Sequence, residues 1–213
     1  MSNRARSYLH LDELLVHYHE RCHHIRHRLA EFASVNPCEY YWELAYCLLT
    51  PQSSAMHAVH AVEVLRLAEA SGSPLDTAAV LRNRQWYIRF HNTKAQRLQE
   101  ARATFPEIAH RLSSGMPSPQ MREWLVGHVK GLGWKEASHF LRNIGHRNLA
   151  ILDRHILKNL RYHGIIRSLP PSLTPKQYLA TECRFAAFAE TLGIPLDELD
   201  LLFWSRETGS ILK

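Results

Sequence analysis

Lys135 and Asp153 are the two side chains whose types and spacing could carry a reaction. Lys135 ends the segment Gly131-Leu132-Gly133-Trp134-Lys135, and Asp153 follows eighteen residues later, after the apolar run at 149–152. A lysine amine can attack an electron-poor carbon and form a Schiff base, and an aspartate can stabilise a cation that develops beside it. Attack needs the neutral amine, which is a small minority of lysine side chains at neutral pH. Desolvation in a site would therefore have to supply most of the activation.

Both residues also have a plain structural interpretation. Lys135 could be a solvated surface lysine, and Asp153 could be the N-cap of a helix that begins at Arg154. The cap does not exclude the chemical role, because one carboxylate can serve both. The sequence around the two residues must decide between these interpretations.

The elements that would position Lys135 are two helices joined by a glycine turn. Apolar residues keep a helical spacing on both sides of residues 131–134: Met121, Trp124, Leu125 and Val129 before the turn, and Ala137, Phe140, Leu141 and Ile144 after it. Two glycines one residue apart, Gly131 and Gly133, allow a tight turn and leave backbone N–H groups open to a phosphate at the start of the second helix. The pattern is typical of a helix-hairpin-helix, a DNA-binding motif.

The sequence segments around this hairpin resemble those of a known family. GLGWK followed by ILDRH is similar to the helix-hairpin-helix DNA glycosylases, whose catalytic lysine and aspartate have this spacing. KEASHFLRN and LAILDRHILKNL resemble more narrowly the archaeal-type 8-oxoguanine DNA glycosylase/AP lyase class. TPQSSA near residue 50 and the ending W-x-x-E-T-G-x-x-x-K support that class. The resemblance covers nearly the whole chain.

This resemblance implies a reaction and its catalytic residues. The protein would excise 8-oxoguanine from double-stranded DNA and cleave the strand at abasic sites by β-elimination through a Schiff base on Lys135. Asp153 would stabilise the sugar cation, and Gly131 and Gly133 would hold the DNA backbone. No cofactor or metal is expected.

The resemblance also assigns residues to the lesion. Gln52 would fill the space around the flipped nucleotide, and Phe90 or His91 would line the pocket. Trp204 would stack on the base, and the carboxylate of the C-terminal Lys213 would accept a hydrogen bond from N7–H, which is a donor only in the oxidised base. Without the resemblance, the chain end would be a frayed terminus.

The outlying motifs also have simpler interpretations. The segment 50–54 could be a loop that supplies a serine cap for a helix at 55–70. Trp86, Tyr87 and Phe90 would each be in the core more often than stacked on a base. The histidines of the first helix include pairs at i,i+4 spacing that could bind a metal, but a solvated face is the favoured interpretation.

Composition and charge agree with a DNA-binding protein. The chain has 213 residues, 46% of them hydrophobic, and a formal net charge of +6 that suits a polyanionic partner. It shows no signal sequence and no apolar run of membrane-spanning length. We therefore expect a monomer in the cytoplasm, associated with the nucleoid and not exported.

Four cysteines lie far apart and in no metal-binding pattern: Cys22, Cys38, Cys47 and Cys183. They indicate reduced, mostly buried thiols. Some glycosylases of this superfamily carry a four-cysteine iron–sulfur cluster near the C-terminus, and only Cys183 lies in that region. An iron–sulfur cluster is therefore not expected.

The fold predicted is all-α, with ten or so helices in two lobes and the active site in the cleft between them. Residues 35–147 would form one lobe, and residues 1–34 and 148–213 the other. The pattern predicts a first helix at 10–33, and a helix at 92–104 followed by a shorter one after Pro106.

Two other functions remain open from the sequence. The protein could be a glycosylase for another lesion, such as an oxidised pyrimidine or an alkylated purine. It could also be a helix-hairpin-helix DNA-binding protein that performs no chemistry.

Overall fold

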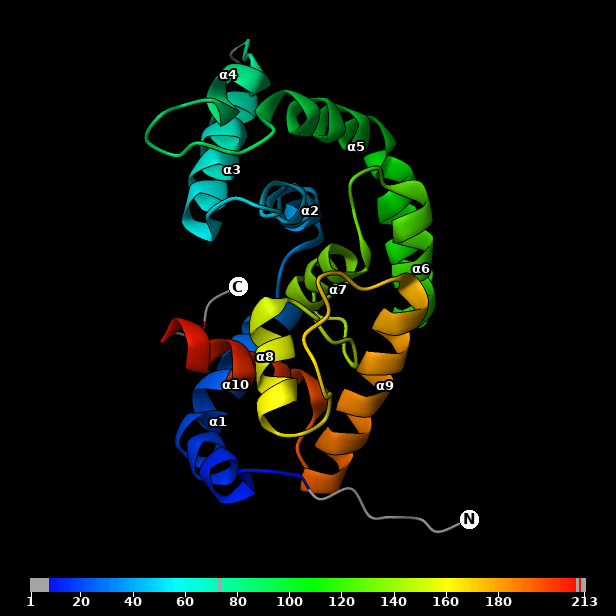
Figure 1. The fold of residues 1–213 in the computed structure, drawn as a ribbon. Coiled ribbons are helices and arrows are strands. Elements are labelled where there is room, and N and C mark those ends of the chain that lie inside the picture. Colours follow the sequence, from blue (N-terminus) through cyan, green and yellow to red (C-terminus); the bar gives the residue numbers. More distant parts are fainter. Residues whose placement is uncertain (1–7, 73, 210, 212–213) are drawn as a thin grey trace. The chain divides into compact units, whose positions relative to one another are not determined.

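The computed structural model describes residues 8–72, 74–209 and 211, and in this part of the chain every regular element is helical (Figure 1). The all-α prediction is confirmed. The elements in chain order are α1 (Leu11–Ala33), the 3-10 turn η1 (Pro37–Glu39), α2 (Tyr40–Leu49), α3 (Ala55–Ala70), α4 (Thr77–Leu81), α5 (His91–Leu112), α6 (Ser118–His128), α7 (Trp134–Asn143), α8 (Arg154–Tyr162), α9 (Pro175–Leu192) and α10 (Leu196–Thr208).

The chain divides into two compact units. Residues 35–144 form the first unit, and residues 1–34 and 145–213 form the second. The sequence analysis placed the later boundary at residue 147. Lys135 belongs to the first unit and Asp153 to the second.

The unit of residues 35–144 is built around α2. Eight of the ten residues of α2 are buried, and α3, α5 and α7 all pack against it (Figure 1). A helix that is apolar on most of its circumference has to be covered on all sides, as the sequence of α2 predicts. The hairpin helices α6 and α7 pack on each other. The lysine candidate is therefore fixed to the core of this unit through α7.

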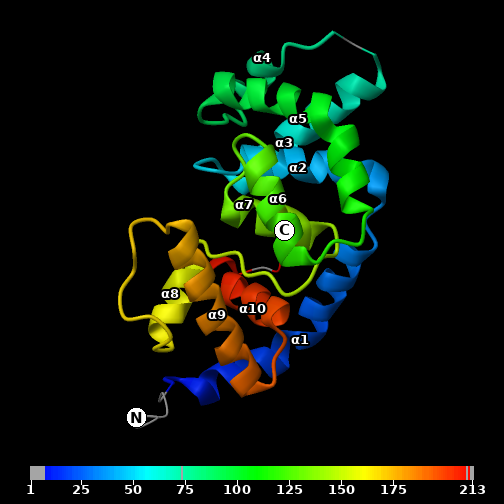
Figure 2. The same ribbon diagram turned by 90° about the vertical axis from the view of Figure 1, so that its right-hand side faces the viewer.

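The other unit packs α1, α8 and α9 against α10 (Figure 2). The helix predicted at 10–33 is α1, and its apolar stripe is buried at Leu14, Tyr18, Ile25 and Leu29. The exposed face of α1 carries most of the histidines of this helix. Within the described residues, no three His, Cys, Asp or Glu side chains gather as a metal site would require. No described helix is long and apolar enough to cross a membrane.

Thr174 and Gln177 form a capping box at the start of α9. Several local predictions are wrong. Instead of breaking at Pro106, α5 continues as one helix, with buried residues on both sides of the proline, Ala101 and Ile108. Ser54 makes no capping hydrogen bond to α3. All four cysteines are free thiols, but only Cys47 is buried, so the expectation of mostly buried thiols was wrong.

Candidate active site

The hairpin turn depends on Gly131 more than on Gly133. Gly131 has φ 89°, and a Cβ there would lie 2.5 Å from Cδ of Arg97. Gly133 has φ −86°, which any residue can adopt, and its Cβ would meet only the end of the Glu136 carboxylate, at 2.9 Å. A side chain at position 131 is therefore strained in any orientation, whereas one at position 133 needs only Glu136 to move.

Arg122 holds the two hairpin helices together. Its side chain is only 1% exposed, and Nη1 donates to Oγ of Ser138 at 3.1 Å. Its guanidinium carbon lies 4.9 Å from the ring centroid of Trp134. Arg122 of α6 therefore contacts the first two turns of α7, next to Lys135. The sequence analysis did not identify this residue, because an arginine in an amphipathic helix is usually solvated.

Lys135 lies in the first turn of α7 with its side chain one-third exposed. Its Nζ is 3.1 Å from Oε1 of Glu136, the next residue along the chain. The first backbone N–H groups of a helix have no acceptor within the helix. The N-cap residue of α7 is Gly133, which has no side chain to cap this end. The start of α7 thus combines a reachable amine with the positive end of a helix, as a phosphate site requires.

Gln52 and Phe90 lie on two chain segments that a hydrogen bond to Ser53 connects. Gln52 is exposed and Phe90 is 51% exposed, and both have left-handed backbones, with φ 55° and 58°. Oγ of Ser53 accepts a hydrogen bond from the backbone N–H of Arg89 at 3.0 Å. The structure therefore brings these two predicted lesion-facing residues into adjoining segments. His91, the alternative to Phe90, is half-buried, with its ring 5.7 Å from that of Tyr87.

The exposure of the aromatic run differs from the expectation of core residues. Phe90 and Tyr87 are about half exposed, and Trp86 is half-buried with Nε1 donating to the carbonyl of Val80. Ile88 is the fully buried residue of this run. The guanidinium of Arg89 lies 4.9 Å from the Phe90 ring centroid, so an aromatic face and a cation are presented together.

Lys94 is a second lysine of this unit and is only 3% exposed. Burial lowers its pKa to about 8, with the charge of Arg97 acting in the same direction and that of Glu136 opposing it. A lowered lysine pKa is a common mark of a nucleophile. However, the Lys94 ammonium already donates to three acceptors inside the protein, so it is not free to reach a substrate.

Asp153 is the N-cap of α8, as its position before Arg154 predicts. Its Oδ1 accepts from the backbone N–H of Ile156 at 2.8 Å, and its side chain is half-buried. One oxygen therefore has a structural role.

The segment that leads to Asp153 is fixed by side chains from distant helices. Four of the five backbone N–H groups of residues 148–152 have acceptors on α9 and α10: Asp197 accepts from Asn148, Glu182 from Ala150, Asp200 from Ile151, and the Tyr178 hydroxyl from Leu152. Asp197 and Asp200 are 3% and 2% exposed. Buried carboxylates thus replace hydrogen bonds that a helix or sheet would provide. The local sequence gives no sign of these bonds, because the partners are 26–49 residues away.

The C-terminal helix places Trp204 beside its buried face. Leu199, Leu202 and Phe203 are fully buried, and Trp204 is half-buried, as the helical spacing predicts. Lys213 lies outside the described residues.

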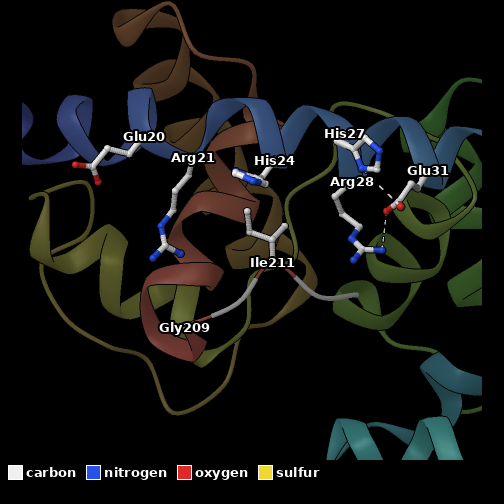
Figure 3. Close-up of a pocket in the computed structure, with 8 residues that line it drawn as sticks. All are labelled: Glu20, Arg21, His24, His27, Arg28, Glu31, Gly209 and Ile211. Carbon is white, nitrogen blue, oxygen red and sulfur yellow. Dashed lines mark ion pairs between the residues drawn. The ribbon is translucent and has the colours of Figure 1, made fainter.

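A hollow lies in the same unit, between α1 and residues 209 and 211 (Figure 3). It measures about 680 Å³ and is lined by Glu20, Arg21, His24, His27, Arg28, Glu31, Gly209 and Ile211. Arg28 pairs with Glu31 at 2.7 Å. The two arginines and two glutamates of this lining balance in formal charge.

Comparison with known proteins decides the family. The family model described as 8-oxoguanine DNA glycosylase matches residues 25–194. This chain belongs to that family. An 8-oxoguanine DNA glycosylase/AP lyase of Fusobacterium nucleatum is 38% identical over 208 residues, which are 92% of this chain and 94% of the relative. One of Korarchaeum cryptofilum is 40% identical over 190 residues, 89% and 90% of the two chains.

Solved structures of the family have the same fold. The crystal structure of the Methanocaldococcus jannaschii 8-oxoguanine glycosylase/lyase in complex with a 15mer DNA containing 8-oxoguanine matches with a TM-score of 0.81 and 30% identity, over 94% of this chain and all of that one. The 8-oxoguanine DNA glycosylase of Thermotoga maritima also gives 0.81, with 32% identity over 95% and 98% of the chains. The fold is therefore that of the helix-hairpin-helix glycosylases.

Proposed function

We propose that the protein is a bifunctional base-excision-repair enzyme that removes 8-oxoguanine from DNA and cleaves the strand at the abasic site. The observation that carries this proposal is Lys135, a reachable amine beside the open N-terminus of α7, in a chain of the 8-oxoguanine glycosylase family. A pure DNA-binding hairpin has no need of an amine at this position. The positive end of the helix would hold the backbone phosphate.

Lys135 is the nucleophile in this proposal. The target nucleotide is first flipped out of the duplex. The neutral amine then attacks C1′, the C1′–N bond breaks, and its electron pair leaves with the base. The sugar ring opens to a Schiff base, a proton is lost from C2′, and the C3′–O3′ bond breaks to release the 3′ phosphate. Water finally hydrolyses the Schiff base and restores the amine.

Glu136 pairs with the Lys135 amine before DNA binds. Its carboxylate lies 3.1 Å from Nζ, so the amine has to leave this partner before it can attack. Both side chains are partly solvated, so the pair is worth only about 0–1 kcal/mol. Displacement of the carboxylate, together with exclusion of water around a bound nucleotide, would release the nucleophile.

Asp153 would stabilise the positive charge that develops on the sugar as the base departs. Its capping bond uses Oδ1, and the second oxygen and the net charge remain for this role. The buried acceptors that fix residues 148–152 support it, because electrostatic stabilisation requires a preorganised charge.

We assign the lesion to three residues on the strength of the family resemblance. Phe90 and Trp204 would contact the flipped base with their aromatic faces. The carboxylate of Lys213 would accept from N7–H of 8-oxoguanine and repel N7 of guanine, which is an acceptor. Gln52 would occupy the gap that the flipped nucleotide leaves. We further propose that the enzyme acts as a monomer at the nucleoid.

A trapping experiment tests the function. The protein is incubated with duplexes carrying 8-oxoguanine, an oxidised pyrimidine, an alkylated purine or no lesion, and borohydride is added to reduce any Schiff base. We expect a covalent protein–DNA band with 8-oxoguanine and with a pre-formed abasic site. A band only with another lesion would change the substrate, and none with any lesion or abasic site would leave a DNA-binding protein.

A further inference from the structure

Lys94 is a buried cation that the proposed reaction leaves without a role. Its Nζ donates to the carbonyls of Leu49 and Pro51, both at 2.7 Å, and to Oγ of Ser53 at 3.2 Å. An ammonium has three N–H groups, and each finds one acceptor here. All three acceptors lie in or beside the loop 50–54, which joins α2 to α3. Burying a charge costs free energy, and hydrogen-bond partners held in fixed positions offset that cost.

These hydrogen bonds set the direction of Gln52. The carbonyl of Pro51 belongs to the peptide group that immediately precedes Gln52, so the bond from Lys94 fixes the plane of that peptide. Gln52 itself has φ 55°, a conformation that a non-glycine residue keeps only where its surroundings enforce it. The bond from Lys94 is one such constraint.

Lys94 is also bonded to the segment that carries Phe90. Its backbone N–H donates to the carbonyl of Phe90 at 2.9 Å, and Ser53 accepts from both the Lys94 ammonium and the N–H of Arg89. Within the described residues of the 35–144 unit, Gln52 and Phe90 are the two non-glycine residues with positive φ. One lysine therefore bonds to both strained segments, and backbone strain of this kind is concentrated at functional sites.

We propose that Lys94 is a positioning residue that holds Gln52 and Phe90 in one fixed arrangement, so that the gap-filling and base-contacting side chains engage the flipped nucleotide together. This inference rests on the roles proposed above for Gln52 and Phe90. Lys94 itself does not touch the substrate. Its effect should therefore appear in base excision from a duplex and not in cleavage of a ready-made abasic site, which needs no damaged base to be recognised.

The test compares Lys94→Met with Lys176→Met, an exposed lysine in the first turn of α9. Methionine keeps the length of the side chain and removes its charge and its donors. A misplacement of about 1 Å can slow an enzyme about 100-fold. We expect Lys94→Met to lower the single-turnover rate of 8-oxoguanine excision about 10- to 100-fold, with abasic-site nicking within about threefold of wild type. The Lys176→Met control should match wild type in both assays.

A double-mutant cycle separates positioning from a general loss of structure. If Lys94 acts through the loop 50–54, the losses of excision rate from Lys94→Met and Gln52→Ala should not add. The double variant should then be little slower than the slower of the two single variants. Losses that multiply, or equal losses of excision and nicking in Lys94→Met, would overturn the inference. So would wild-type excision by that variant.

Two further outcomes are distinguishable. If Lys94→Met does not fold, Ser53→Ala carries the test, because it removes the hydroxyl that accepts from both Lys94 and Arg89. It should slow excision several-fold and leave nicking unchanged, and unchanged excision would overturn the inference. If instead the wild-type protein excises no 8-oxoguanine, the proposed function itself fails.

Discussion

The hairpin that carries Lys135 and the segment that carries Asp153 are held in place in different ways. The hairpin is local: a glycine with positive φ turns the chain, and two adjacent helices pack on each other. Residues 148–153 instead have no regular structure of their own. Side chains 26–49 residues away accept hydrogen bonds from the backbone N–H groups of Asn148, Ala150, Ile151 and Leu152. A nucleophile can thus be delivered by a short motif, whereas the placement of the carboxylate depends on the whole unit.

The largest effect on activity should come from replacing Lys135 in the hairpin. Lys135→Gln should lower both base excision and abasic-site nicking by at least about 1,000-fold, because both steps use the same amine. Duplex binding should be nearly unchanged, since the glycine turn and helix start remain. Gel-shift titration and single-turnover cleavage measure these quantities. Near-normal nicking would remove Lys135 from the mechanism.

Asp153→Asn separates charge from capping in the other segment. An asparagine oxygen can still accept from Ile156, so the melting temperature should change little. Loss of the carboxylate should slow base excision about 100- to 1,000-fold, the range for removing one preorganised electrostatic group. Calorimetry and single-turnover excision provide the two readouts. If the folded variant excises 8-oxoguanine at the wild-type rate, Asp153 serves only as a helix cap.

The C-terminus tests whether lesion recognition is separate from both segments. Residues appended after Lys213 move the free carboxylate away and leave an amide in its place. Excision of 8-oxoguanine should fall at least about 100-fold, because sites that pair a substrate N–H can discriminate by about 10⁴–10⁵ at best. Nicking of an abasic site should persist. If a C-terminally extended protein excises as well as the unextended one, the lesion is read elsewhere.

Lys94 predicts a pH dependence of stability in the unit that carries the hairpin. Its pKa in the folded protein is about 8 against an ordinary value of 10.5, so the unfolded chain binds more protons between these values. The stability of the wild type relative to Lys94→Met should therefore rise between pH 8 and 10.5, by up to about 3 kcal/mol. Denaturant unfolding of both proteins measures the difference in stability. The contributions of the tyrosines and Cys47 cancel, because both proteins contain these residues. A flat difference would mean that Lys94 is not desolvated.

The smallest effect concerns Glu136, which is local to the hairpin. Glu136→Gln removes the ion pair that occupies the Lys135 amine. The nicking rate should rise by less than about fivefold, since a partly solvated pair is worth only about 0–1 kcal/mol. Single-turnover nicking of an abasic site measures the change. A slower variant would mean that Glu136 assists the reaction.

The sequence predicts features that depend on neighbouring residues. The hairpin and the Asp153 cap each arise within a few positions, and the structure contains both. The failures depend on distant contacts. Pro106 continues a helix that packing supports, and Tyr87 and Phe90 are exposed although their types favour a core. Ser54 makes no capping bond, while its neighbour Ser53 bonds to Lys94 and Arg89, which the spacing of the loop could not indicate.

The same limit applies to the candidate site. Lys135, Asp153 and Gln52 could be proposed from the sequence because recognisable motifs surround them. Lys94 and Arg122 could not, because a buried lysine or arginine looks like a solvated one in sequence. Their hydrogen-bond partners become visible only in the folded structure.

The identity of the nucleophile tests the account most directly, because the unit of residues 35–144 offers two contrasting lysines. Lys94 has the lowered pKa but is buried and donates to three acceptors, whereas Lys135 is reachable and pairs with one carboxylate. The borohydride adduct formed on 8-oxoguanine duplex can be digested and its modified residue located by mass spectrometry. We predict the sugar remnant on Nζ of Lys135. An adduct on Lys94, or on any other amine while Lys135 stays unmodified, would contradict the account.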